Sequence, residues 1–141
     1  MLVAPNGANH LEVLAPMALV VSLPMLQATI ARALAAQPVD RSRIERAAAL
    51  IALGHVEQID ASTYAVRSQC ADDVTYTVTP DGCACVDASR RPTSWCKHQW
   101  AARILVAAEM AQQAQAQQDG RQRAAADTTA LAYASSYRTA A

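Results

Sequence analysis

Residues 74–100 read VTYTVTPDGCACVDASRRPTSWCKHQW, and this stretch decides the fold. Val74, Tyr76 and Val78 alternate with threonines, a pattern typical of a β-strand with one buried face. The Pro-Asp-Gly sequence that follows predicts a turn. Two cysteines separated by one residue come next, then a loop, then a Cys-x-His pair at the start of a helical pattern. A sheet is therefore expected to lead through a cysteine-rich segment into a helix.

The paired spacing of cysteine and histidine in this run favours a metal site. The candidate ligands are Cys83, Cys85, Cys96 and His98. Zinc prefers four tetrahedral ligands drawn from thiolates and imidazoles. Side chains at i and i+2 of an extended segment point the same way, so the first pair can share one ion. In a helix such positions diverge, so Cys96 is expected just before the helix and His98 in its first turn. The predicted cofactor is one structural zinc ion.

Other uses of the same thiols stay open. A Cys83–Cys85 disulfide would be strained, because the Cα atoms of such a pair lie near the upper limit of about 7 Å. A reducing compartment also disfavours it. An iron–sulfur or redox site and unrelated core thiols are further alternatives. Cys70 has no mate in the pattern, and we expect a half-buried thiol there.

Basic residues flank the candidate ligands. They are Arg90, Arg91, Lys97 and Arg103. Three thiolates and a neutral imidazole around a divalent ion leave one net negative charge. The first three basic residues are expected to offset this charge and to donate hydrogen bonds to sulfur. All four together form the candidate patch for nucleic-acid phosphates. In the plainer interpretation they balance the site and the nearby Asp81 and Asp87.

The run CACVDASRRPTSWCKH, with ten residues between Cys-x-Cys and Cys-x-His, resembles the SWIM zinc finger. The resemblance covers about residues 55–108, because the hairpin pattern before the cysteines and the helix after the histidine follow the same order. It implies a zinc-binding module that contacts DNA or protein. Val86 stands where many SWIM domains carry proline.

Two helices are expected before the sheet. Residues 24–37 begin with a proline, which suits the first turn of a helix, and carry apolar residues at helical spacing. A second helical pattern follows between Asp40, a good N-cap, and Gly54, a good residue just beyond a helix end.

Three strands then follow close together in the sequence, at residues 55–59, 63–69 and 74–79. Such short connections predict an antiparallel meander, with Tyr64 and Tyr76 as cross-strand core partners. The expected fold class is α+β: a small antiparallel β-meander flanked by helices, with a zinc knuckle joining the last strand to the C-terminal helix.

The C-terminal helix is expected to start near Cys96 and to bury an apolar face as far as residue 108. Trp100 is assigned to the core, and Trp95 either to the core or to a contact surface. Residues 107–118 are mostly Ala and Gln, which favour helix but bury little. Gly120 is expected to end the helix.

The composition predicts one small domain with a thin core. The chain has 141 residues, of which 33 are Ala and none is Phe, and alanine buries little area. Small domains of this kind commonly need a metal or disulfides. The expected parts are a poorly ordered arm (1–23), a helical N-terminal segment (24–54), a SWIM-like zinc-binding domain (55–108), and an Ala/Gln-rich helix extension with a disordered tail (109–141).

The net charge and the apolar N-terminal segment argue against attraction to nucleic acid by overall charge and against a membrane role. Basic and acidic residues number 12 each, so no global field attracts nucleic acid or an anionic membrane. The apolar segment 13–30 contains two prolines and follows no Lys or Arg, so neither a membrane span nor a signal peptide is expected. The expected location is the reducing cytoplasm.

Four protein ligands close a zinc site, and no motif for a nucleophile with its base is visible, so neither an enzyme nor a small-molecule substrate is expected. The sequence predicts a protein–protein interaction adaptor with a structural zinc and an unknown protein partner. DNA or RNA binding through the basic residues is the alternative.

Overall fold

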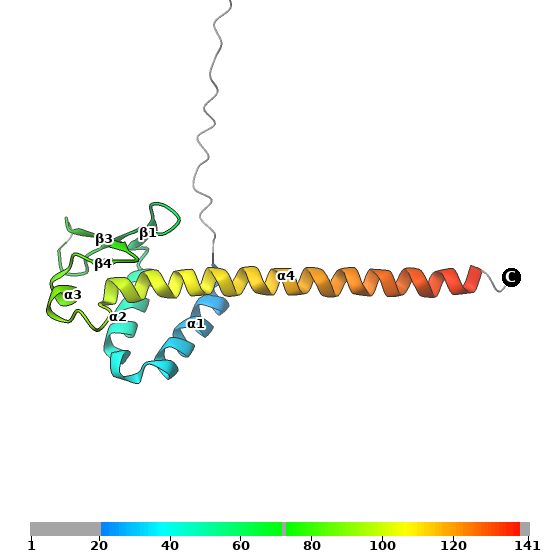
Figure 1. Ribbon diagram of the computed structural model, residues 1–141, viewed down its shortest axis with the longest axis horizontal. Coiled ribbons are helices and arrows are strands. Elements are labelled where there is room, and N and C mark those ends of the chain that lie inside the picture. Colours follow the sequence, from blue (N-terminus) through cyan, green and yellow to red (C-terminus); the bar gives the residue numbers. More distant parts are fainter. Residues whose placement is uncertain (1–20, 72, 139–141) are drawn as a thin grey trace, which may run out of the picture.

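The computed structural model describes residues 21–71 and 73–138, with side chains as far as residue 135. The expected arm at 1–23 therefore lies outside the described residues, except for its last three. The elements in chain order are α1 (Leu23–Ala36), the 3-10 turn η1 (Pro38–Asp40), α2 (Arg41–Ala52), β1 (Val56–Gln58), β2 (Tyr64–Arg67), β3 (Thr75–Thr79), β4 (Gly82–Cys83), α3 (Val86–Arg90) and α4 (Lys97–Arg138). Figure 1 shows the sheet on one side of the first turns of α4 and the α1–α2 pair on the other.

The four strands form one antiparallel sheet in the order β1-β2-β3-β4, which confirms the expected α+β class and meander. The short β4 extends the meander and places Cys83 opposite Val78 of β3. Tyr64 and Tyr76 were wrongly paired, because Tyr64 lies opposite Val78 and Tyr76 lies opposite Val66. All of these residues share one face, since each pair is two residues from the next.

The core lies where this face of the sheet meets α2 and α4. Its members are Ile44, Ala47, Leu50, Tyr64, Val66, Val78, Trp100, Ala101, Ala102 and Ile104. Trp100 is only 5% exposed, as predicted. Three of the ten are alanines, so the area removed from water per residue is small. A core of this size gives a domain limited stability, so a further cross-link at the end of the sheet would raise the free energy of unfolding substantially.

The ends of α2 follow the expected signals with one change. Gly54 has φ of +69°, the left-handed conformation that ends a helix and that glycine adopts without strain. Asp40 occupies the N-cap, but its carboxylate accepts from Arg43 at 3.1 Å instead of from a backbone amide. Arg43 also donates to Asp87 at 3.3 Å. This arginine therefore ties α2 to α3, at the candidate metal site.

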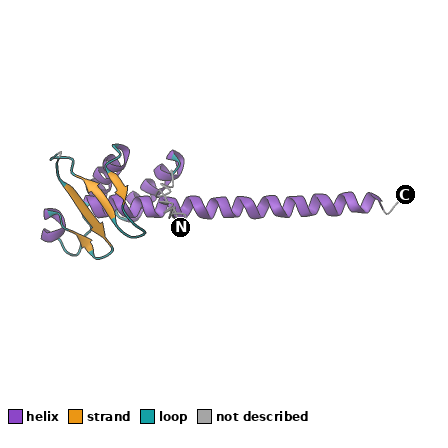
Figure 2. Ribbon diagram, turned by 90° about the horizontal axis from the view of Figure 1, so that it is seen from above, coloured by secondary structure: helices purple, strands orange, loops and turns teal. Residues whose placement is uncertain are grey.

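Helix α4 is much longer than expected, because it continues through Gly120 to Arg138. At about 1.5 Å per residue its 42 residues span about 63 Å. Figures 1 and 2 show that its distal part extends away from the sheet and the other helices. The prediction that Gly120 ends the helix was wrong, since one glycine costs about 1 kcal/mol and the surrounding Ala, Gln and Arg favour helix. Despite this length, none of the described helices is apolar enough to cross a membrane.

Replacing Gly120 by alanine is expected to stabilise the distal part of α4 by about 0.8–1 kcal/mol. A Cβ at this position meets nothing within 4 Å, and the backbone there is not in the left-handed region. Hydrogen exchange of the neighbouring amides and far-ultraviolet circular dichroism should both report more helix. Faster exchange or a loss of helical signal would contradict a continuous helix across this residue.

Candidate metal centre

The structure brings the four predicted ligands together at the junction of the sheet and α4. They are Cys83, Cys85, Cys96 and His98, and their ligand atoms all lie within 4.8 Å of one another. Nδ1 of His98 lies 3.8 Å from Sγ of Cys83 and 3.9 Å from Sγ of Cys96. A tetrahedral ion with Zn–S bonds of about 2.3 Å has ligand atoms about 3.8 Å apart. The spacing and the donor set therefore fit zinc.

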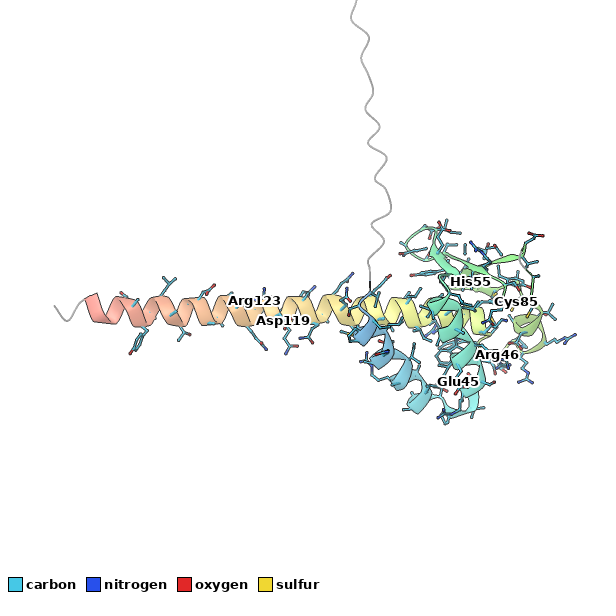
Figure 3. All side chains as sticks on the ribbon, turned by 180° about the vertical axis from the view of Figure 1, so that it is seen from behind. Glu45, Arg46, His55, Cys85, Asp119 and Arg123 are labelled. Carbon is cyan, nitrogen blue, oxygen red and sulfur yellow. The ribbon has the colours of Figure 1, made fainter. Side chains whose placement is uncertain are left out.

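Three short elements deliver these side chains. Cys83 ends β4, Cys85 immediately precedes α3, and Cys96 immediately precedes α4. His98 lies in the first turn of α4, as the i, i+2 argument requires. Figure 3 places Cys85 on the side of the globular part that faces away from the projecting end of α4.

The site is closed to solvent on most sides. Cys85, Cys96 and His98 are at most 3% exposed, and Cys83 is half-buried. None of the cysteines forms a disulfide. Cys70 lies outside the cluster and is exposed, not half-buried as the sequence suggested, because it falls in the loop between β2 and β3.

Two of the cysteines cap helices. Sγ of Cys85 accepts a hydrogen bond from the Ala88 amide at 3.4 Å, at the start of α3. Sγ of Cys96 accepts from the Gln99 amide at 3.4 Å, and the Gln99 side chain accepts from the Cys96 amide at 3.1 Å. This exchange has the form of a capping box, with sulfur in place of the usual hydroxyl. The helix starts therefore stabilise negative charge on both sulfurs.

The three thiols of the cluster have pKa values shifted in different directions. A hydrogen bond from Cys83, the largest cause, lowers the pKa of Cys96 to about 4. The same bond holds the Cys83 proton and raises the pKa of that thiol, and burial raises the pKa of Cys85. A divalent ion must displace the protons of Cys83 and Cys85, so protons and metal compete for the cluster.

Replacing Gln99 by alanine removes one half of the capping box but no ligand atom. We expect a loss of about 1 kcal/mol in the free energy of unfolding with unchanged metal stoichiometry. Chemical denaturation and elemental analysis measure the two quantities. Gln117→Ala, on the exposed part of the same helix, is the matched control and should change neither. Metal loss in the Gln99 variant would contradict a role limited to the cap.

Tyr76 is a site residue that sequence reasoning did not assign to the metal. Its ring centroid lies 4.6 Å from that of His98, with 34° between the planes, so it restricts the orientation of the imidazole. Nε2 of His98 is buried without a hydrogen-bond partner among the described residues, while Nδ1 faces the sulfurs. The sequence feature that could have revealed Tyr76 is the period of two in β3. It puts Tyr76 on the same face as Val78, which lies opposite Cys83.

The four basic residues near the ligands have different surroundings. Arg90 and Arg91 are exposed near the end of α3. Lys97 donates to Gln69 at 3.3 Å, and Arg103 stacks on Trp95 with its guanidinium carbon 3.4 Å from the ring centroid. Among the described residues, the donors to the sulfurs of Cys85 and Cys96 from outside the ligand set are backbone amides. Charge compensation and hydrogen bonding to sulfur by Arg90, Arg91 and Lys97 stay predictions.

Lys97 and Arg103 also diverge around α4. They are six residues apart, which corresponds to a separation of about 120° around a helix with 3.6 residues per turn. One therefore reaches the β2–β3 loop and the other reaches Trp95. The structure therefore places Lys97 and Arg103 on different sides of α4. The candidate nucleic-acid patch of four basic residues stays a prediction.

Comparisons with models of protein families, with curated proteins and with solved structures find no match to this chain. The geometry of the Cys83, Cys85, Cys96 and His98 cluster thus carries the functional argument.

Proposed function

We propose that this chain is a zinc-binding module of the SWIM type that acts as a protein–protein interaction adaptor. The observation that carries the proposal is the buried cluster of three sulfurs and one imidazole nitrogen within 4.8 Å of one another. The zinc in this proposal is structural, because four protein ligands fill a tetrahedral site and leave no open position for a substrate.

The proposed ion would join the end of the sheet to the start of α4. Cys83 ends β4 and His98 lies in the first turn of α4. The chain between them contains the short helix α3. Contacts of α1 and α2 with the proximal part of α4 hold the other side of the helix. The ion therefore fixes the base from which the rest of α4 projects (Figure 1).

The exposed surface of the projecting part of α4 favours a protein as the partner. Its described side chains are almost all exposed from residue 113 to 135, and they include Leu131 at 72% and Tyr133 at 66% exposure. Basic and acidic residues are interspersed there, with Arg121 and Arg123 between two aspartates. A mixed surface of this kind provides little attraction for a phosphate backbone, whereas exposed apolar side chains on a helix suit a protein groove.

A photo-crosslinking residue tests the adaptor proposal directly. Placed at Leu131 in the zinc-loaded chain, it is expected to capture a discrete protein partner in the host. The same group at Val39, which is 95% exposed but lies in η1, is the control and should capture none. Binding to duplex DNA or to RNA that weakens steeply with salt, without any captured protein, would instead support the nucleic-acid alternative.

A further inference from the structure

A groove runs beside α4 between α1 and the sheet. Its volume is about 830 Å³, and its walls come from α1, from α4 and from the turns after β1 and β3. The α4 wall reaches from Gln99 to Ala111, a length of about 18 Å at 1.5 Å per residue. An extended peptide of five or six residues covers about that distance.

Most of the groove lining is apolar. Both helices contribute alanines, among them Ala33, Ala36 and Ala107, which allow another chain to approach the backbone closely. Met110 at 65% and Trp95 at 37% exposure are the large apolar side chains accessible there. Such a surface matches apolar side chains of a ligand, and flexible Met and rigid Trp are common in binding surfaces.

The charged groups of the groove all have the same sign. Arg32 of α1 and Arg103 of α4 line it, and no Asp or Glu does. Arg32 donates to the Thr29 hydroxyl at 3.2 Å, and Arg103 lies over Trp95. Neither guanidinium forms an ion pair with a carboxylate in the described part of the chain. Two arginines without counterions, beside an apolar floor, complement a ligand that carries carboxylates.

We infer that this groove binds a short apolar segment of another protein that carries Asp or Glu side chains. The apolar side chains pack against the alanines and Met110, while carboxylates pair with Arg103 and Arg32. Nucleic acid fits less well, because two cations on an apolar wall neutralise few phosphates. The inference deepens the proposed adaptor role by naming the chemistry of one partner, at a surface distinct from the distal part of α4.

Intrinsic fluorescence provides the test, because the chain has two tryptophans and both line the groove. The probes are two synthetic leucine-rich peptides without tryptophan, one with glutamates and one with lysines at the same positions. Titrated into the zinc-loaded full chain, the glutamate peptide is expected to change the emission saturably and to bind at least about tenfold more tightly than the lysine peptide.

Charge reversal sharpens the result. Arg103→Glu and Arg32→Glu are each expected to weaken the glutamate peptide about tenfold, and the double variant to prefer the lysine peptide. That switch also shows that the variant is folded. Arg91→Glu, an exposed arginine outside the groove, is the matched control and should leave both affinities unchanged.

Equal binding of the two peptides, or no change in emission with either, would overturn the inference. The second result is also expected if a second copy of the chain or its own residues 1–20 fill the groove. Neither outcome would alter the metal content or the crosslinking at Leu131, so failure of this inference is separable from failure of the proposed function.

Discussion

Replacing Cys96 by serine is expected to abolish zinc binding and to unfold the region around the site. Cys96 is 1% exposed and ligates in the proposed cluster. A serine hydroxyl can still cap α4, so the substitution removes the thiolate ligand in particular. Structural zinc supplies roughly 10–16 kcal/mol of apparent folding free energy, which exceeds what a thin core provides. Elemental analysis should show zinc lost. Tryptophan emission should shift to the red, because Trp100 would leave a site where it is 5% exposed.

Cys70→Ser is the matched control for this substitution. It makes the same chemical change at an exposed cysteine outside the cluster. Metal content and the thermal transition should stay as in the original chain. A Cys96 variant that melts at the same temperature and retains its zinc would show that the cluster does not hold the fold.

Replacing Leu50 by alanine should lower the free energy of unfolding by about 3 kcal/mol, within the range of roughly 2–5 kcal/mol for such buried positions. Leu50 is fully buried in the cluster that joins α2, the sheet and α4. The loss combines the transfer of the removed methyl groups with the cavity left behind. Urea denaturation of the zinc-loaded protein measures it.

Leu131→Ala removes the same atoms from a leucine that is 72% exposed on α4. The change in unfolding free energy should stay within about 0.5 kcal/mol, as for most surface substitutions. Similar losses in the two variants would contradict the assignment of the core. They would indicate instead that the distal part of α4 packs against something in the folded protein.

Local patterns were enough to predict the sheet and the clustering of the three cysteines with His98. The alternation of Tyr76 and Val78 with threonines specifies a half-buried strand, and the short turns leave antiparallel pairing as the simple solution. The i, i+2 spacing of Cys96 and His98 requires a break between extended chain and helix, and α4 begins between these residues at Lys97. These predictions succeeded because each rests on geometry within a few residues.

Predictions that depended on competing small energies failed. Gly120 is a common helix terminator, yet its cost of about 1 kcal/mol is small against a long run of good helix formers. Val86–Arg90 was expected to be loop but forms the five-residue α3. Its start is capped by the sulfur of Cys85, an acceptor that the usual capping rules do not include.

The hydrogen bonds and side-chain directions around the site were the hardest features to predict from the sequence. Hydrogen bonds to Cys85 and Cys96 come from backbone amides. Every residue but proline carries such an amide, so the residue type does not predict these bonds. The directions of Lys97 and Arg103 depend on which neighbours they meet across the fold. These two side chains are close in the sequence, whereas helical geometry points them in different directions.

The central claim is that one zinc ion joins the sheet to α4 through three sulfurs and one imidazole nitrogen. X-ray absorption at the zinc edge of the purified chain tests it most directly. The account predicts one zinc per chain, with three sulfur neighbours at about 2.3 Å and one nitrogen at about 2.0–2.1 Å. A chain purified without zinc, or a zinc surrounded mainly by oxygen, would contradict it.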